Sequence, residues 1–410
     1  MKNSSLLPIP TPDNFTMQDL ILCQILLDLR SSNIRADIIS ELPDPILCHI
    51  LSFLPTKQAA TTSVLSKRWK TPWLSILALH FDDETFKVKD SFRKFVHSTM
   101  FKLRDKKTSI HSFAFKSGRS SHFTQKQYNR IFKTVMQYGV QNLNFNMSNK
   151  IRITKLPLRI FGLKMLQFLS LTNILIGDFD QVNFPHLKTL HLNSVRFKNH
   201  EYFVNFLFGC PILENLESWL SFNNHQRHHI SKDLNILPNL VEIRISGVNT
   251  PMALVCNAKV LHLEKMRWTK WTELPMFHNL IHLEINFDAM TFKDECSSLL
   301  GILPHFPKLQ HFNIQDNAGA LSKHFKCWID PSTVSECLSS KLKTCCIRGY
   351  KGAEYEFGLA KYIMQHSKLL ETITIECAWL KQITWLSKRH MRLKLSSCTM
   401  GSTTCNLLFY

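Results

Sequence analysis

Short apolar alternations recur along most of this 410-residue sequence. Each of the clearest copies approximates Leu-x-x-Leu-x-Leu and ends in two apolar residues one position apart: Leu169/Leu171, Leu190/Leu192, Ile243/Ile245, Leu261/Leu263, Leu283/Ile285, Phe312/Ile314 and Ile373/Ile375. Weaker copies lie at Phe113/Phe115, Leu143/Phe145, Leu216 and Cys345/Ile347. Because successive side chains of a strand point to opposite faces, each pair predicts a short strand with one buried face. Repetition on this scale favours an array of units that pack on their neighbours.

Segments of helical period separate these strands. "SFRKFVHSTMFKLR", "YNRIFKTVMQYG" and "EYFVNFLFGCP" each place apolar residues on one helical face, and Gly139 and Gly209 are expected to stop the second and third helices. The apolar pairs are 18 residues apart from Ile243 to Leu261 and 33 apart from Phe312 to Cys345. Most intervals lie in or near the leucine-rich-repeat range of about 20 to 29 residues. We therefore predict an α/β fold: an irregular leucine-rich-repeat solenoid whose curved parallel sheet lines a concave wall.

An N-terminal stretch has a different pattern. "LPDPILCHILSFLPTKQAATTSVLSKRW" predicts two amphipathic helices, one from Pro45 to about Leu54 with Asp44 as its N-cap, and one from about Lys57 to Trp69. The apolar residues of the first helix form one broad face: Ile46, Leu47, Ile50, Leu51 and Leu54. A helical pair too small to own a core should bury that face against a partner.

Composition limits the class of protein. With 44% hydrophobic and 20% charged residues the chain is an ordinary globular one, and its net charge of +19 permits an acidic partner such as nucleic acid, inositol phosphate or an acidic protein surface. Solvated lysines alone would give the same charge. The 12 cysteines form no Cys-x-x-Cys pair, which indicates a reducing, intracellular compartment, the nucleus or cytoplasm. The apolar segment 15–29 contains Asp19 and Asp28 and is too short to span a membrane, so no membrane association is expected.

Signals for catalysis or cofactor binding are weak. His225, His228 and His229 have metal-compatible spacing, but no nearby Cys or Glu completes a ligand set, so a solvated loop and no metal site are predicted. "GYKGAEYEFG" lacks the Lys-Ser/Thr ending of a phosphate-binding loop. A nucleophilic cysteine would need orienting partners that the sequence does not show. We expect no catalytic residues and no cofactor.

The residues between the paired strand apolars should face the concave side of the solenoid. They are Ala114, Asn144, Ser170, His191, Glu217, Arg244, His262, Glu284, Asn313 and Thr374. Arg244 is the only fixed cation among them, so the set lacks the basic stripe that a phosphate backbone would need. This composition argues against nucleic acid as the partner. Any single one of these positions is equally explained as an exposed strand residue of no special importance.

Two regions resemble a known family. Segment 37–76 resembles the F-box of plant F-box proteins in Leu42-Pro43, Ile50-Leu51, Leu54-Pro55 and the ending Val64-Leu65-Ser66-Lys67-Arg68-Trp69. Pro45 departs from the acidic residue expected there. Segment 327–375 resembles the FBD domain that closes many plant F-box/leucine-rich-repeat proteins, and "LSSCTMGSTTCNLLF" resembles that family's C-terminal end. The resemblance divides the chain into an extension of unknown role (1–35), an F-box (36–82), a leucine-rich-repeat region (83–320) and an FBD-like region that continues the repeats (321–410).

The resemblance implies a non-catalytic substrate receptor of a Skp-cullin-F-box ubiquitin ligase. The F-box would bind a Skp-type adaptor and, through it, the cullin and RING subunits, while the repeats would hold a target protein close to the ubiquitin-loaded enzyme. The expected adaptor-binding residues are Leu42, Pro43, Ile46, Leu47, Ile50, Leu51, Leu54, Val64, Leu65 and Trp69. The expected target-binding residues are His191, Arg244, His262 and Glu284. The alternative is a basic leucine-rich-repeat module that binds nucleic acid or another acidic ligand without a ligase role.

Overall fold

The computed structural model describes most of the chain in two compact units, which meet between Phe81 and Asp82. The described residues are 42–70, 72–75, 78–104, 110–118, 123–147, 154–222, 237–246, 252–264, 274–287, 299–317, 328–379 and 383–410. The apolar segment 15–29 and the histidines at 225, 228 and 229 lie outside these ranges. No helix within the described ranges is long and apolar enough to cross a membrane.

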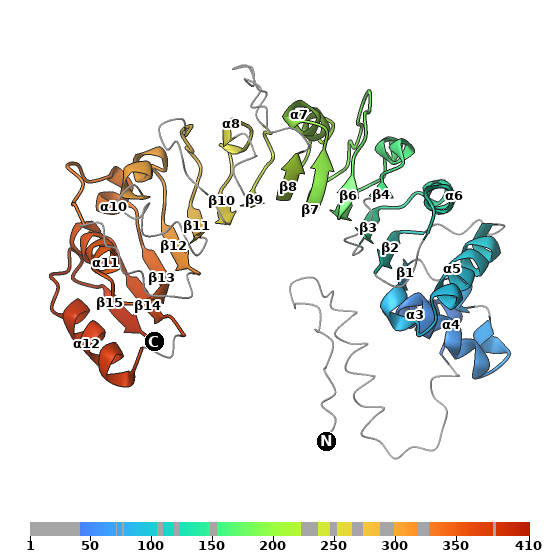
Figure 1. Cartoon of the computed structure of the whole chain (residues 1–410), viewed down its shortest axis with the longest axis horizontal. Coiled ribbons are helices and arrows are strands. Elements are labelled where there is room, and N and C mark those ends of the chain that lie inside the picture. Colours follow the sequence, from blue (N-terminus) through green and yellow to red (C-terminus); the bar gives the residue numbers. More distant parts are fainter. Residues whose placement is uncertain are drawn as a thin grey trace, which may run out of the picture. The chain divides into compact units, whose positions relative to one another are not determined.

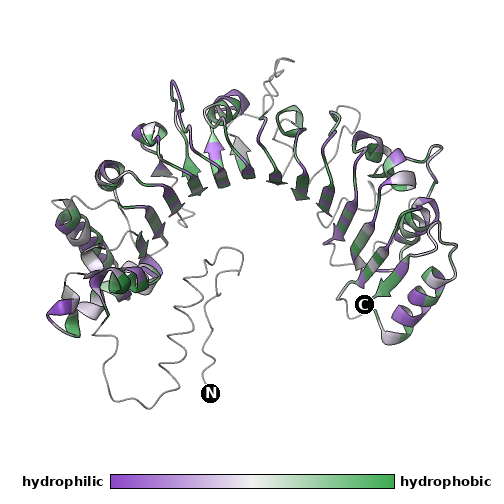
Figure 2. Ribbon diagram, turned by 180° about the vertical axis from the view of Figure 1, so that it is seen from behind, coloured by the Kyte–Doolittle hydropathy of each residue, from purple (hydrophilic) through white to green (hydrophobic). Residues whose placement is uncertain are grey.

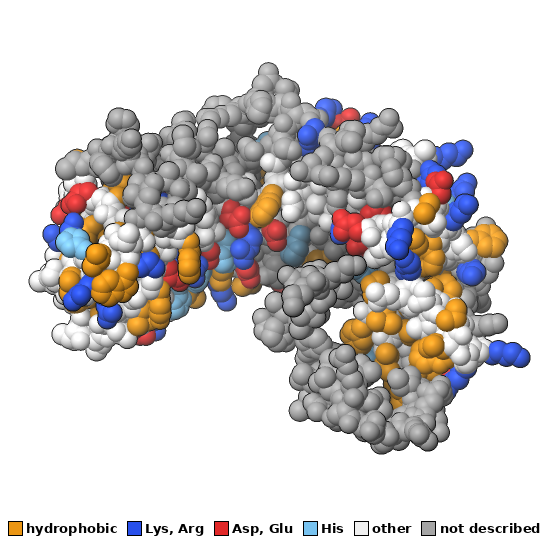
Figure 3. All heavy atoms as spheres, turned by 60° about the horizontal axis from the view of Figure 1, so that its bottom comes forward, with side chains coloured by type: hydrophobic (Ala, Val, Ile, Leu, Met, Phe, Trp, Pro, Cys, Tyr) orange, Lys and Arg blue, Asp and Glu red, His pale blue; other side chains and the backbone are white. Residues whose placement is uncertain are grey.

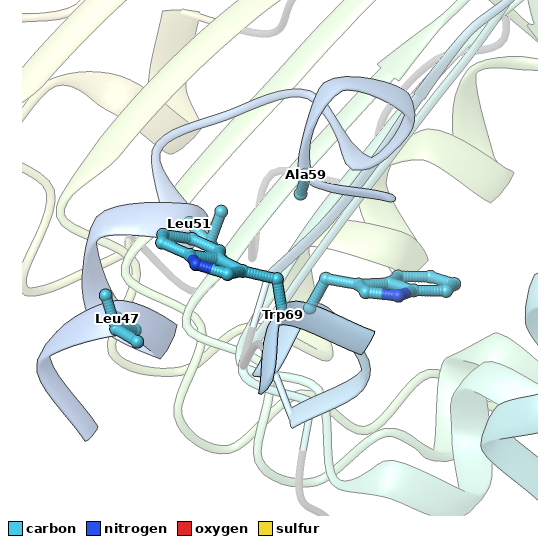
Figure 4. Close-up of a cluster of buried hydrophobic side chains, with 5 residues drawn as sticks. Leu47, Leu51, Ala59 and Trp69 are labelled. Atoms are coloured by element: carbon cyan, nitrogen blue, oxygen red, sulfur yellow. The ribbon is translucent and has the colours of Figure 1, made fainter. Parts of the chain in front are cut away.

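Unit 1 contains two short helices, three single turns of 3₁₀ helix and one strand. The elements are α3 (Asp44–Ser52), α4 (Thr56–Thr61), η2 (Thr62–Val64), η3 (Arg68–Lys70), η4 (Pro72–Ser75) and β1 (Ala78–Asp82). Their core consists of Leu47, Leu51, Ala59, Trp69 and Trp73. Figure 4 shows Leu47 and Leu51 from α3 meeting Ala59 from α4 and Trp69 from η3. Two large indole rings thus supply much of the apolar surface that holds these short segments together.

Two details of the predicted helices in unit 1 are wrong. Asp44 is the first residue of α3, after Pro43, and makes no capping hydrogen bond. Its carboxylate instead accepts charge-assisted hydrogen bonds from Nη2 and Nε of Arg68, at 2.9 and 3.1 Å. The second helix stops at Thr61 rather than continuing to Trp69. The reason is local, since the hydroxyls of Thr61 and Thr62 bond to carbonyls three residues earlier and compete with the helical pattern.

Unit 2 is built on one parallel sheet. Its strands are β2 (Ser112–Ser117), β3 (Asn142–Met147), β4 (Thr154–Lys155), β5 (Phe168–Thr172), β6 (Ile174–Leu175), β7 (Thr189–Phe197), β8 (Asn215–Phe222), β9 (Glu242–Ser246), β10 (Val260–Glu264), β11 (His282–Phe287), β12 (His311–Asp316), β13 (Thr344–Tyr350), β14 (Thr372–Cys377) and β15 (Asn406–Phe409). Apart from the short pair β4 and β6, the strands lie side by side in chain order. Apart from an additional pairing of β6 with β7, each of these strands hydrogen-bonds with the strand before it and the strand after it, which is the arrangement of a solenoid.

Helices and 3₁₀ turns cover one face of this sheet. They are η5 (Asp83–Thr85), α5 (Lys89–Arg104), α6 (Gln125–Val135), η6 (Met136–Tyr138), η7 (Leu158–Gly162), α7 (His200–Phe208), α8 (Met252–Val255), η9 (Leu303–His305), α10 (Glu336–Ser340), α11 (Glu354–His366) and α12 (Trp385–Ser396). Figure 1 shows the strands of unit 2 along the inner side of an open arc, with the helices outside. The predicted leucine-rich-repeat solenoid is confirmed, and Gly139 ends the second predicted helix in a left-handed conformation with φ of 63°.

The core of unit 2 lies between the sheet and these helices. The paired strand apolars all point into it, and Leu169, Leu190 and Ile243 are completely buried. Figure 2 shows hydrophobic and hydrophilic residues alternating along the strands, as a sheet with one buried face requires. Near the start of the sheet the core is aromatic, and the rings of Phe115 and Phe145 stack with centroids 5.2 Å apart. Each such buried side chain contributes about 1.5–3 kcal/mol to stability.

Candidate protein-binding surfaces

Unit 1 exposes large apolar side chains around its small core. The exposed fractions are 40% for Ile46, 57% for Phe53, 85% for Val64 and 66% for Leu65. An isolated exposed leucine is ordinary, but four such residues on about twenty residues of chain form a candidate protein-binding surface. We call Ile46, Phe53, Val64 and Leu65 the apolar rim.

The structure separates the predicted adaptor-binding residues by role. Leu47, Leu51 and Trp69 are at most 5% exposed and form the core of unit 1, so in this structure the chain itself covers these side chains. An amphipathic face signals burial without telling whether the covering surface belongs to the same chain. Leu42, Ile50 and Leu54 are half-buried, and Pro43, Ile46, Val64 and Leu65 are exposed. Phe53 was missed, although its place at the end of an apolar helix was the available signal.

The second candidate surface is the uncovered face of the sheet in unit 2. The ten residues predicted to face the concave side, together with Cys346, pair strand by strand in one continuous register: Ala114, Asn144, Ser170, His191, Glu217, Arg244, His262, Glu284, Asn313, Cys346 and Thr374. We call these residues the central row. Neighbouring strands are about 4.8 Å apart, so adjacent side chains of the row can contact one another.

The middle of the central row is a network of charged groups. His262 contacts two carboxylates, Glu284 Oε2 at 3.2 Å from its Nδ1 and Glu242 Oε1 at 3.6 Å from its Nε2. Arg244 lies between Glu242 and Glu264, with nitrogen to oxygen distances of 3.7 and 3.8 Å. Three of the four predicted target-binding residues, Arg244, His262 and Glu284, therefore lie on consecutive strands of one network.

The fourth predicted residue, His191, lies two strands before Arg244 in the central row. Its Nδ1 is 4.0 Å from Glu217 Oε2, and its ring meets the ring of Phe168 edge-on at 5.1 Å. Partial burial holds the pKa of His191 below its ordinary value. The His191 imidazole is therefore a neutral group beside a carboxylate, able to donate or accept a hydrogen bond.

Several residues of this surface were not among the predicted ones. Glu242, His282 and His311 lie two residues before the central row on their strands, Glu264 lies two residues after it, and Cys346 belongs to the row itself. Extending the two-residue alternation by one step beyond each apolar pair would have found them. Within the network, the hydrogen bond from His262 lowers the pKa of the Glu284 carboxyl to about 2.

The local charge of this face differs from that of the whole chain. Strands β8 to β11 carry the carboxylates Glu217, Glu242, Glu264 and Glu284 and a single fixed cation, Arg244. Figure 3 shows acidic and histidine side chains among the polar groups of the strand-lined face. The chain has a net charge of +19, so its excess positive charge is not concentrated here. A phosphate backbone would be repelled by this part of the surface.

Cations do gather on the helical side of unit 2. A hollow of about 490 Å³ between α6 and η7 is lined by Lys126, Arg130, Lys133 and Arg159. Phe132 and Met136 contribute apolar walls. This arrangement can attract an anionic group, because four positive side chains border one concave site.

Burial raises the pKa of eight of the nine described cysteines. Burial raises the pKa of the Cys337 thiol to about 12 and that of Cys346 to about 11, and it raises the pKa of Cys210 and Cys345 as well. The reactive form of a cysteine is the thiolate, which these shifts disfavour. Among the described residues, these thiols lack the lowered pKa that a ubiquitin-carrying nucleophile needs.

Comparison with known proteins finds three matches to domain families along the chain. Residues 39–71 match the F-box domain, residues 128–247 match the leucine-rich repeats of the FBD-associated F-box protein At5g56370, and residues 330–375 match the FBD domain. The chain therefore contains, in this order, matches to an F-box domain, to leucine-rich repeats and to an FBD domain.

Its similarity to individual proteins extends over nearly the whole chain. The FBD-associated F-box protein At5g56370 of Arabidopsis thaliana is 28% identical, over 91% of this chain and 100% of that protein. The F-box/FBD/LRR-repeat protein At4g26340 of the same plant is 26% identical over equal shares. The FBD-associated F-box proteins of Arabidopsis thaliana are thus homologues of this chain, and the resemblance found in the sequence is confirmed.

Proposed function

We propose that this chain is the substrate-recognition subunit of a Skp-cullin-F-box ubiquitin ligase complex in the nucleus or cytoplasm. The observation that carries the proposal is the apolar rim, which lies within the segment that matches the F-box domain. Burial of such a rim against an adaptor would remove apolar surface from water and would link unit 1 to the cullin and RING subunits. The chain itself would contribute proximity and no chemical step.

The central row and its charged neighbours are the proposed target-binding surface. His191, Arg244, His262 and Glu284 remain the proposed contacts, and Glu242 and Glu264 join them. The excess of carboxylates on β8 to β11 favours a target segment that offers lysine or arginine side chains. Charged groups at such a surface select among targets more than they add affinity.

The test compares exposed and buried residues of the F-box. Ile46→Ala combined with Leu65→Ala removes two rim side chains that unit 1 does not need for its core, and each anchor of an interface typically contributes about 2 kcal/mol or more to binding. We expect capture of a purified Skp-type adaptor to fall by at least tenfold while the melting temperature stays that of the parent.

Leu158→Ala, which truncates a 48% exposed leucine in unit 2, is the matched control and should capture the adaptor like the parent. Leu42→Ala with Pro43→Ala is the second F-box variant, expected to weaken capture while the repeats stay folded. Full adaptor capture by both F-box variants would contradict the proposal.

The hollow between α6 and η7 favours a second candidate function, binding of an acidic ligand. Lys126, Arg130, Lys133 and Arg159 are the groups that would contact it. A fluorescent single-stranded oligonucleotide and inositol hexakisphosphate are suitable probes. Binding of either probe that weakens steeply with salt, and that is lost in Arg130→Gln with Lys133→Gln, would support this candidate.

A further inference from the structure

Three potential metal ligands converge on the uncovered face of the sheet. His262 comes from β10, and His282 and Glu284 come from the neighbouring strand β11. One ligand atom from each residue lies within 4.8 Å of the others. The two imidazole rings have centroids 5.6 Å apart. Register explains this convergence, because His262 pairs directly with Glu284 and His282 lies two residues before Glu284 on the same face.

The spacing of these atoms suits coordination. His262 Nδ1 and Glu284 Oε2 are 3.2 Å apart. Two ligands at about 2.0–2.2 Å from a tetrahedral zinc ion are separated by a similar distance. The three donors are two imidazoles and one carboxylate, a set that occurs in zinc sites with a fourth position left for another ligand. Small rotations of the His282 side chain would bring its ring nitrogen to the same centre.

Groups around the three donors would orient them. The other nitrogen of His262, Nε2, is 3.6 Å from Glu242 Oε1, so a carboxylate stands behind this histidine as it commonly does behind metal-bound histidines. The side-chain amide of Asn313 lies 3.4 Å from Nε2 of His282, and with its oxygen turned toward the ring it would accept a hydrogen bond from the Nε2–H of a histidine that binds metal through Nδ1. His262 is only 9% exposed, so its ring is held in place by its neighbours.

We propose that His262, His282 and Glu284 form a binding site for a divalent transition-metal ion with the preferences of Zn²⁺. Its remaining coordination position faces the open side of the sheet, since these residues lie on the face that helices leave uncovered. An oxygen, nitrogen or sulfur atom of a bound ligand could occupy that position. The site does not depend on adaptor binding, so it stands or falls independently of the proposed ligase role.

Direct metal binding tests this proposal. The purified full-length chain is stripped of metal and titrated with Zn²⁺ against a chromophoric chelator, and Co²⁺ is then used to read the ligand type from its absorption spectrum. We expect one equivalent of metal bound through nitrogen and oxygen, without the intense band that a thiolate ligand gives. Glu284→Gln keeps a side-chain oxygen near His262 but removes the anionic ligand, and it should weaken binding at this site by at least tenfold. His262→Ala and His282→Ala should each abolish it.

His191→Ala is the matched control, because His191 also lies in the central row beside a glutamate but has no second histidine in such a group. It should bind metal like the parent. The melting temperature gives a second readout, since Zn²⁺ should raise that of the parent and of His191→Ala but not that of Glu284→Gln. Unchanged stoichiometry and affinity in all three ligand variants, or a cobalt spectrum dominated by thiolate, would overturn the proposal.

Discussion

Lys351 and Asp316 form an ion pair whose side chains are 2% and 3% exposed, which makes it a fully buried charge pair of unit 2. Asp316 ends β12, and Lys351 directly follows β13, so the pair ties the ends of two neighbouring strands together. The backbone N–H of Lys351 also donates to Glu356 Oε2 at 2.8 Å, at the start of α11. Three ionisable residues, one from the end of β12 and two from the FBD region, thus meet in the core of unit 2.

Breaking this pair should destabilise unit 2 strongly. Lys351→Met leaves the Asp316 carboxylate buried without its cation, and we expect a loss of about 3–5 kcal/mol in the free energy of unfolding, measured by urea denaturation. Adding Asp316→Leu removes the remaining charge and should restore most of the loss. A single variant as stable as the parent would show that the carboxylate is solvated or otherwise paired.

Gly349 should not tolerate a side chain. Its φ is 77°, and a Cβ there would lie 2.1 Å from the backbone oxygen of Asp316, at the irregularity between Arg348 and Tyr350 in the pairing of β13 with β14. Gly349→Ala should therefore cost more than the roughly 1–2 kcal/mol of the left-handed conformation alone. Gly301→Ala, where a Cβ meets nothing within 4 Å, is the control. Equal melting temperatures for the two variants would contradict the expectation.

The buried Glu356 carboxyl should make stability depend on pH. Desolvation raises its pKa from 4.5 to about 7, although the backbone N–H groups of Lys351 and Ala353 donate to it. The folded state therefore holds this proton more tightly than the unfolded state, and the resulting stability is complete below pH 4.5 and is lost as the pH rises through 7. The size of the effect is on the order of 3 kcal/mol.

Glu356→Gln should remove this loss, because an amide oxygen can keep both backbone hydrogen bonds without ionising. The measurement is the unfolding free energy of the variant minus that of the parent, followed from pH 4.5 to 7.5. This difference should become more positive as the pH rises. Glu354→Gln changes an exposed neighbour in the same helical turn and should leave the difference flat. A flat difference for Glu356→Gln as well would show that this carboxyl does not titrate in the window.

Carboxylates of the strand-lined face should govern target capture without affecting folding. Glu242→Gln with Glu264→Gln removes two negative charges around Arg244, and a target recovered with the parent should be recovered several-fold less. The measurement is affinity purification with the proteasome blocked, followed by mass spectrometry. Glu201→Gln, on the helical side in α7, should leave recovery unchanged. If target recovery is unchanged in Glu242→Gln with Glu264→Gln but falls in Glu201→Gln, the target binds the helical side instead.

The chain should carry no ubiquitin thioester. Burial raises the pKa of Cys337 and Cys346 far above neutral pH, so their thiolate forms are scarce. Incubation of the purified chain with activating enzyme, conjugating enzyme and ubiquitin should give no reducible adduct on non-reducing gels. An adduct that disappears with reductant would contradict this expectation.

Local periodicity is enough to predict the fold of unit 2. Alternation alone predicts a strand at Leu169 and Leu171, and another at Leu283 and Ile285. Parallel pairing of such strands follows from the helical segments between them. The same rule correctly placed His191 and Arg244 on one face. It could not bring His282 into the group with His262, because that contact depends on the register between two strands and on side-chain rotation.

Unit 1 shows where such reasoning stops. The apolar face of α3 was correctly recognised, but Leu47 and Leu51 turn out to pack on Trp69 and Trp73 of the same chain. The apolar periodicity of a helix predicts that a side chain is buried, but it does not predict which surface covers that side chain. The exposed Val64 and Leu65 follow a helix whose early end is set by threonine hydroxyls, a short-range competition that an apolar pattern does not encode.

The strand-by-strand register of the central row has a consequence for how this protein can acquire new specificity. Each strand presents its outward side chains at every second residue, while the residues between them, such as Ile243 and Ile245 around Arg244, form the core. Exchange of an outward residue therefore changes one position of the proposed target-binding surface and leaves the supporting layer intact. Such a sheet can accommodate many combinations of outward residues at little cost in stability, because the side chains of its open face and those of its buried face belong to different residues.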